Sequence, residues 1–186
     1  SGRTKGNLDT VASKCKGEVS VKPLDVSNYE DVRAVFEDIM SEYGRVDVLV
    51  ASAGLNAKNR NWHNVSEEDF DQVIKIDLNG VFYTNRLVLE KMKEQREGLI
   101  INISSWAGKY VTTLTGPAYT AAKHGVNALT EGINMEAGHF GVRACAICPG
   151  EVATPILDKR PIPVSKEDRE KMVQPEDCAE TVAFLA

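Results

Sequence analysis

Three short apolar runs, separated by longer segments, constrain the fold of this chain more than any other feature. The runs are residues 46–51, 99–103 and 142–148, and each consists mainly of apolar residues. A run that does not alternate with polar residues is typical of a strand buried on both faces of a parallel sheet. The sequence therefore predicts an α/β fold with a doubly wound parallel sheet, in a single domain covering residues 1–186.

Helical patterns lie before the first of these runs and between the others. The first begins at a capping box formed by Ser27 and Glu30 and continues as an apolar repeat to Gly44. The other two cover residues 66–98 and 117–139. Because parallel strands need crossover connections of this length, the helices support the α/β prediction.

Residues 158–175 are rich in Pro, Lys and Glu and show no apolar period, so we expect an irregular surface segment. The segment follows the third apolar run, and ligands of doubly wound sheets bind beyond the carboxyl ends of the strands. It is therefore placed to cover a substrate site, and a plain solvated linker is an equal alternative.

Charge and hydropathy exclude several kinds of partner. The 22 basic and 27 acidic residues are mixed along the chain and give a net charge of -5, so there is no basic stripe for nucleic acid or a membrane surface. No apolar stretch reaches the roughly 18 to 20 residues of a membrane span, and the first residues lack a signal-peptide pattern. We expect a cytoplasmic protein that acts on a small molecule.

Cysteine and histidine usage argues against a metal or redox site. The four cysteines are scattered: Cys15, Cys145, Cys148 and Cys178. The CxxC pair of Cys145 and Cys148 lies in an apolar run rather than at a helix start, so packed core thiols are favoured over a redox or metal role. None of the three histidines has acidic or thiol partners at metal-ligand spacing.

Tyr119 and Lys123 lie four residues apart in the third predicted helix, which places the phenol and the ammonium on one helix face. A neighbouring cation favours the phenolate, and this helps a tyrosine act as a general acid or base. Alone the pair is weak evidence, because Tyr and Lys occur at this spacing by chance on many helices.

Small residues follow each of the three apolar runs. They are Ser52-Ala53-Gly54, Ser104-Ser105 and Pro149-Gly150. Since the carboxyl ends of parallel strands meet at one edge, we expect these turns on one rim of the sheet. Such a rim lets a flat, extended ligand such as a dinucleotide lie against the backbone, and a hydroxyl there can hold a substrate oxygen.

This ordered set resembles the short-chain dehydrogenase/reductase family, over nearly the whole chain. Ser105 matches the family's catalytic serine, and Tyr119 and Lys123 match its YxxxK motif. The resemblance implies a Rossmann-like domain and an NAD(P)-dependent oxidoreductase that interconverts an alcohol and a carbonyl. It also implies that Tyr119 exchanges the proton, that Ser105 holds the reacting oxygen, and that Lys123 assists Tyr119 and binds the nicotinamide ribose.

The resemblance further implies a cofactor site and an oligomer. The matching residues are Ser52, Ala53 and Gly54 for the family's Asn-Ala-Gly turn, Asp25 and Val26 for its adenine contact, and Pro149, Gly150, Val152 and Thr154 for its carboxamide motif. Family members dimerise through two long helices, which the helices over residues 66–98 and 117–139 resemble. A homodimer or homotetramer is therefore expected.

The chain departs from the family pattern at both ends. The glycine-rich phosphate loop that the family has after its first strand is absent, and the sequence stops before the position of the family's last strand. We therefore expect this chain to lack the first βα unit and the last strand, and by itself to bind a dinucleotide poorly.

Asp77 is a third departure, because it takes the place of the Asn in the family's Asn-x-x-Gly helix motif. In the family that Asn helps to hold a water that joins the lysine to solvent. A carboxylate can hold the same water, but it adds a negative charge near Lys123. The alternative is that Asp77 is an ordinary polar position and that Asn79 compensates.

Arg3 bears on the choice of cofactor. The resemblance places it at the end of the family's second strand, where NAD users tend to have an acid and NADP users a base. A guanidinium can pair with a 2'-phosphate, so NADP is preferred over NAD, and a solvated arginine is the alternative.

Aromatic residues and the fold itself leave further alternatives open. Trp62, Trp106 and Tyr110 fall near the expected pocket mouth, where they favour a hydrophobic substrate or simply pack the loops. The same fold also serves non-catalytic NAD(P)-binding sensors or scaffolds, and epimerases or dehydratases. The presence of Ser105, Tyr119 and Lys123 together favours the oxidoreductase.

Overall fold

The computed structural model describes all 186 residues and contains one three-stranded parallel sheet. The strands are β1 (Val48–Ala51), β2 (Gly98–Ile103) and β3 (Val142–Ile147), in that order across the sheet. Ala51 pairs with Asn102, and Ile103 pairs with Ile147, so all three strands end at the same edge. The predicted α/β fold with a parallel sheet is confirmed, although β1 begins two residues later than its apolar run.

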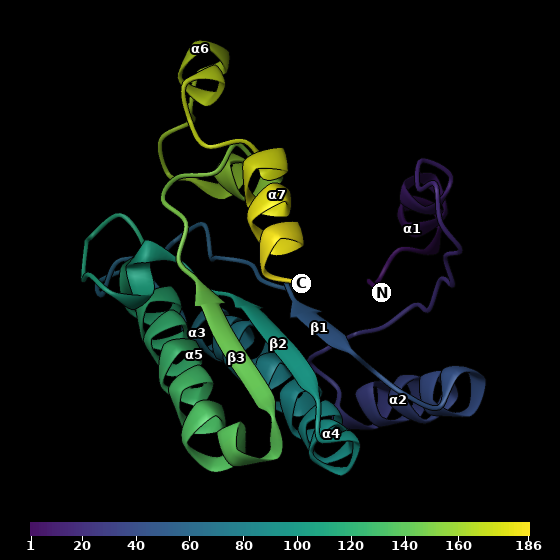
Figure 1. Cartoon of the computed structure of the whole chain (residues 1–186). Helices are drawn as coiled ribbons and strands as arrows, with labels where there is room; N and C mark the ends of the chain where they lie inside the picture. The colour runs from purple at the N-terminus through teal and green to yellow at the C-terminus, as the bar shows by residue number, and fades with distance from the viewer.

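Seven α-helices accompany the sheet (Figure 1). They are α1 (Lys5–Ala12), α2 (Tyr29–Tyr43), α3 (Glu67–Ile74), α4 (Gly80–Gln95), α5 (Gly116–Ala137), α6 (Lys166–Glu170) and α7 (Pro175–Leu185). Helices α4 and α5 supply the crossovers and pack against one face of the sheet. Short 3-10 turns cover residues 106–108, 138–140 and 155–159.

Helix α2 begins one residue later than the sequence predicted. Asn28 is its N-cap, and the Asn28 side chain accepts a hydrogen bond from the backbone N–H of Glu30. The Ser27 hydroxyl donates to Asp25 instead, so the expected capping box of Ser27 and Glu30 is wrong. Helix α2 ends as expected at Gly44, whose positive φ of 74° favours glycine.

The helix expected from Ser66 toward the Lys91 to Gly98 stretch is present, but a π-helical turn that was not predicted interrupts its α-helical hydrogen bonding. Ser66 caps α3 as predicted, with its hydroxyl accepting from the Asp69 N–H at 3.1 Å. The π-helical turn then covers Lys75–Asn79, and α4 continues from Gly80. An apolar period read from sequence does not register one extra residue in a turn, so the break escaped prediction.

The core lies between the sheet and helices α4 and α5. Its main cluster is Val88, Met92, Ile100, Ile133, Ala137 and Val142. Complete burial of Met92 or Ile100 stabilises the fold by about 1.5 to 3 kcal/mol each. A second cluster, which includes Val73 and Ala122, joins α3 to α5 and fixes the helix that carries Tyr119 and Lys123.

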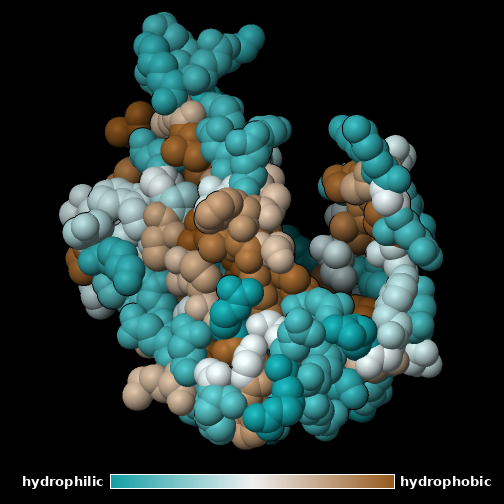
Figure 2. Space-filling model, viewed as in Figure 1, coloured by the Kyte–Doolittle hydropathy of each residue, from teal (hydrophilic) through white to brown (hydrophobic).

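The two ends of the chain pack less tightly than this centre. Neither α1 nor α7 contains a buried residue, and neither helix was predicted from the sequence. In the space-filling view the molecule is hollowed between the N-terminal segment and the rest (Figure 2). Residues 158–175 are mostly irregular as expected, except for the short helix α6, whose N-cap Ser165 accepts from the Asp168 N–H.

Candidate functional site

The turns that follow the three strands lie along one rim, and backbone hydrogen bonds join two of them. The Ser104 N–H donates to the Ile147 carbonyl at 2.8 Å, and the Trp106 N–H donates to the Pro149 carbonyl at 2.9 Å. The turns after β2 and β3 are therefore held as one unit. This arrangement agrees with the expectation from strand polarity.

The Ser105 turn is fixed against α5 from several directions. The Ser104 hydroxyl donates to the Lys123 carbonyl at 3.2 Å, and the Asn127 side chain donates to the Gly108 carbonyl at 2.8 Å. A Cβ on Gly108 would lie only 2.6 Å from the Lys123 carbonyl oxygen, so the close approach requires glycine. The sequence therefore brings Ser105 to the helix that carries Tyr119 and Lys123.

Tyr119 and Lys123 meet on one face of α5, as their spacing predicts. The Lys123 Nζ lies 5.3 Å from the centroid of the Tyr119 ring. Lys123 is only 3% exposed, and its Nζ donates to the Ile103 carbonyl at the end of β2 at 3.2 Å. The structure therefore holds a buried ammonium beside the phenol ring.

Asp77 lies in the π-helical turn and contacts Lys123 directly. Its side chain is fully buried; Oδ1 accepts from the Leu55 N–H at 2.8 Å, and Oδ2 lies 3.4 Å from the Lys123 Nζ. That contact has ion-pair distance without hydrogen-bond geometry, and Oδ2 has no other partner. Burial raises the pKa of the Asp77 carboxyl, and the Lys123 charge opposes that rise.

Gly54 and Asn79 differ in how they lie relative to the pair of Asp77 and Lys123. A Cβ on Gly54 would lie 3.0 Å from the Asp77 Oδ2 and 3.5 Å from the Lys123 Nζ, so the turn after β1 closes directly over the pair. Asn79 forms no hydrogen bond to any of these residues. The carboxylate therefore occupies the position beside the lysine, and Asn79 does not take it over.

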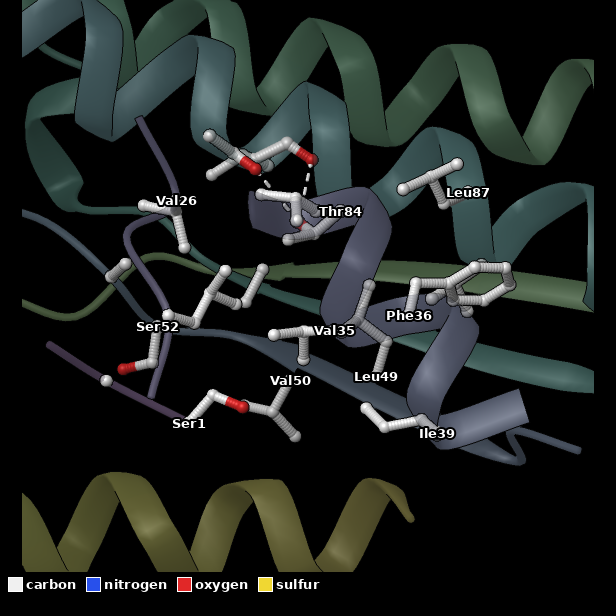
Figure 3. Close-up of a pocket in the computed structure, with 18 of the residues that line it drawn as sticks. Ser1, Val26, Val35, Phe36, Ile39, Leu49, Val50, Ser52, Thr84 and Leu87 are labelled. Carbon is white, nitrogen blue, oxygen red and sulfur yellow. Dashed lines mark hydrogen bonds between the residues drawn. The ribbon is translucent and has the colours of Figure 1, made fainter. Parts of the chain in front are cut away.

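One cavity of about 910 Å³ gathers part of the expected cofactor set. Its lining includes Arg3, Asp25, Val26, Ser52, Ala53 and Gly54. The remainder of the cavity runs along β1 and is apolar (Figure 3). Hydrogen bonds from the Ser27 hydroxyl and N–H lower the pKa of the Asp25 carboxyl, which is therefore available as an anionic acceptor at neutral pH.

The remaining expected cofactor residues lie outside the lining of that cavity. Pro149, Gly150, Val152 and Thr154 follow β3, on the same side of the rim as the Ser105 turn. Val152 forms a bridge with Val173, which ties this segment to the end of residues 158–175. The expected set therefore falls into two groups, one that lines this cavity and one that follows β3.

Residues 158–175 line part of a second cavity of about 720 Å³, together with the loops after β1 and before α5. Arg60 lies in its wall, and sequence reasoning missed this residue. Arg60 is 6% exposed, and its guanidinium donates to the carbonyls of Lys159 and Leu114. A lone arginine in a polar loop gives no local signal of burial.

The aromatic and cysteine side chains that the sequence singled out lie outside the buried core. Trp62 and Tyr110 are 85% and 64% exposed, and Trp106 packs beside Tyr110 with ring centroids 6.1 Å apart. Cys145 and Cys148 are half-buried rather than packed in the core, and all four thiols are free. No cluster of three or more His, Cys, Asp or Glu side chains is arranged to hold a metal ion.

None of the helices combines the length and apolar character needed to cross a membrane.

Comparison with known proteins supplies the family. Residues 1–163 match the model of the short chain dehydrogenase family. The 3-oxoacyl-acyl-carrier-protein reductase FabG of Thermotoga maritima is 32% identical, over 98% of this chain and 77% of that protein. The solved alcohol dehydrogenase of Thermococcus sibiricus, complexed with 5-hydroxy-NADP, is 28% identical and superposes with a TM-score of 0.86, over 99% of this chain and 77% of that one.

A solved chain described as ribose-5-phosphate isomerase from Brucella melitensis is also similar. It is 32% identical with a TM-score of 0.88, over 99% of this chain and 72% of that one. This chain therefore spans about three quarters of the length of these relatives. Since the same fold carries differently named activities, residue roles must come from the geometry of the site.

Proposed function

Because the chain belongs to the short-chain dehydrogenase family, we propose that it interconverts an alcohol and a carbonyl compound with Tyr119 as general acid and base. The NAD(P)-dependent oxidoreductase class follows from the family. That class favours the enzyme over the non-catalytic sensor or scaffold. The roles of individual residues are our proposal, and they rest on the distances and burial at the rim.

The observation that carries the proposal is the cluster of Tyr119, Lys123 and Asp77 beside the Ser105 turn. The ammonium of Lys123 lies 5.3 Å from the Tyr119 ring centroid and is nearly inaccessible to water. In this poorly solvated place its charge acts on the phenol more strongly than it would at the surface. Proton transfer by Tyr119 at working pH is the chemistry that such a pair supports.

Ser105 completes the arrangement with a hydroxyl that is available to the substrate. Its Oγ accepts a hydrogen bond from the Ala107 N–H at 3.1 Å, so its own proton remains free to be donated. We propose that Ser105 donates to the reacting oxygen while Tyr119 protonates it during reduction. In oxidation Tyr119 takes the proton back as a base.

The residues of the rim fit the two ends of a nicotinamide dinucleotide. Asp25 and Val26 suit the adenosine end, and Ser52, Ala53 and Gly54 leave bare backbone between it and Lys123. Lys123, with the segment Pro149–Thr154 of the second group, suits the nicotinamide end. When bound, the cofactor supplies or accepts the hydride. The chain contains no glycine-rich loop for the diphosphate, so these residues account for the ends of the cofactor only.

Arg3 supports a preference for NADP over NAD. It lines the same cavity as Asp25 and is exposed, with no ion pair that would occupy its guanidinium. A 2'-phosphate at that end of the cofactor would find a planar donor there. The Thermococcus sibiricus relative, solved with an NADP analogue, is consistent with this choice.

A cofactor screen tests the proposed function. Thermal unfolding of the full-length protein would be followed with NAD, NADH, NADP or NADPH, because a ligand that binds only the native state raises the melting temperature. We expect the NADP forms to raise it most, and we expect NADPH to be consumed when a panel of ketones and aldehydes is added. A protein that no cofactor stabilises, or that consumes none with any carbonyl, would contradict the proposal.

A further inference from the structure

Arg60 is a buried cation without a carboxylate partner. It is 6% exposed, and no Asp or Glu oxygen lies within ion-pair distance of its guanidinium. The other deeply buried cation at the rim, Lys123, has Asp77. Burial of a charge is costly unless it is paired, so the unpaired guanidinium calls for an explanation.

The protein contacts of Arg60 use its donors but not its charge. Nη2 donates to the Lys159 carbonyl at 2.6 Å, and Nη1 donates to the Leu114 carbonyl at 3.5 Å. Both acceptors are neutral, and the buried Nε has no partner at all. A side chain that only joined two loops would need donors, and a neutral amide provides them without the cost of a buried charge.

The backbone of Arg60 contacts the first turn of α5, the helix that carries Tyr119. Gly116 begins α5 with a φ of 75°, and a Cβ at that position would lie 2.0 Å from the Arg60 carbonyl oxygen. Burial lowers the pKa of the Arg60 guanidinium and the charge of Arg160 adds to that effect, whereas Tyr119 is close enough to oppose it. The backbone of Arg60 is therefore held against the start of α5, and its side chain lines the second cavity.

The acidic groups around the second cavity already have partners. Glu151 pairs with Arg160, and the Asp168 carboxylate accepts from the Ser165 hydroxyl. The cavity measures about 720 Å³ and is lined by the loop before α5 and by the segment that leads to α6. Neither carboxylate lies within ion-pair distance of Arg60, so the cavity offers space beside Arg60 without a protein anion paired to it.

We propose that Arg60 binds a carboxylate of the substrate, so that the enzyme acts on oxo acids and hydroxy acids. This inference rests on the proposed function, because it places the reacting carbonyl at Tyr119 and Ser105. The unpaired charge of a planar cation that lines a cavity suits a carboxylate, and the pairing supplies the missing negative charge. Residues 158–175 would then cover the acid end of the substrate.

The first test needs only the unmodified protein. Reduction by NADPH would be compared for 3-oxobutanoate and 4-oxopentanoate and for the methyl ester of each. We expect each acid to exceed its ester in kcat/KM by about tenfold to a hundredfold, mainly through KM, because the ester has the same carbonyl but no charge. Esters that perform as well as the acids, or turnover of uncharged ketones alone, would overturn the inference while leaving the proposed function intact.

Two substitutions of Arg60 test whether the preference for the acid over its ester depends on the charge of this residue. Arg60→Gln keeps hydrogen-bond donors without the charge and should abolish the preference for the acid. Arg60→Lys keeps the charge and should retain part of the preference for the acid. Arg33→Gln on α2 removes one surface charge of the same kind and serves as the matched control, with no change expected. Equal losses for acid and ester in Arg60→Gln would indicate an effect on Tyr119 or on the loops, and would contradict the inference.

A binding measurement decides the case without turnover. Thermal unfolding of the protein with NADPH would be measured with and without 3-hydroxybutanoate and 4-hydroxypentanoate, and with their methyl esters, because the reduced cofactor cannot oxidise these alcohols. We expect stabilisation by the acids only, and its loss in Arg60→Gln. No stabilisation by either acid, or the same stabilisation in Arg60→Gln, would overturn the inference. A variant that does not fold leaves the comparison of acid and ester in the unmodified protein as the deciding result.

Discussion

The two sides of the rim differ in how firmly the fold holds them. On the side of α5, Lys123 and Asp77 are almost completely buried, and the Ser105 turn is joined to the helix by side-chain and backbone contacts. On the side of Arg3, the segment carries the helix α1 without a buried residue and pairs with itself through a single bridge of Gly2 and Pro23. The groups that we propose for proton transfer are thus held by the core, whereas those that we propose for nucleotide binding lie on a segment with few buried contacts.

The largest effect is expected on the firmly held side, from Tyr119→Phe. The change keeps the ring and removes the proton donor, so turnover should fall at least about a hundredfold. Cofactor stabilisation in thermal unfolding should stay close to that of the unmodified protein. Tyr110→Phe, at an exposed tyrosine near the same rim, is the matched control and should keep its activity. Turnover of Tyr119→Phe near the original value would refute the assignment.

A smaller effect is expected on the loosely held side, from Arg3→Ala. Loss of a guanidinium that pairs with a 2'-phosphate should weaken NADPH by roughly 1 to 3 kcal/mol more than NADH. Titration calorimetry with both cofactors measures the difference, and Lys14→Ala controls for the loss of one exposed charge on the same segment. If both cofactors weaken equally, the preference for NADP loses its basis.

The smallest effect is expected from Asp77→Asn, which tests how the buried pair adjusts the catalytic side. An ionised Asp77 offsets part of the Lys123 charge that favours the phenolate, so its removal should make the phenolate easier to form. The acidic limb of the pH profile for alcohol oxidation should then move to lower pH, while the maximal rate stays within about tenfold.

The same profile separates charge from packing. Asp71→Asn, at an exposed acid on α3, makes the same chemical change without contact to Lys123 and should leave the limb in place. Asp and Asn differ little in volume, so a moved limb in Asp77→Asn reports the charge. A limb that stays in place, or that moves to higher pH, would show that Asp77 does not act on Tyr119 through Lys123.

The sequence predicted the sheet because buried parallel strands appear as continuous apolar runs. It missed α1 and α7 because neither helix buries a residue, and a helix without a buried face gives little apolar period. It missed α6 because five residues are too few for a periodic pattern, even with Ser165 as a cap.

The site was predictable where function depends on local spacing. Tyr119 and Lys123 lie four apart on one helix, and their contact follows from helix geometry. Arg60 was not predictable, because its burial depends on Leu114 and Lys159, which are far from it in the sequence. Likewise, no pattern announces that Asp77 contacts Lys123 directly, since that contact depends on a turn whose hydrogen bonding departs from the α-helix.

The π-helical turn at Lys75–Asn79 also determines the direction in which the side chains of α4 point. Each residue of an α-helix advances the direction of the side chain by about 100°, so one additional residue in a turn re-aims the remainder of the helix by that angle. Here Val73 of α3 packs toward α5, while Met92 of α4 packs into the main cluster against the sheet. If the turn were one residue shorter, Val73 and Met92 could not both keep their present packing. The number of residues in this five-residue stretch therefore matters to the fold as much as their side chains do.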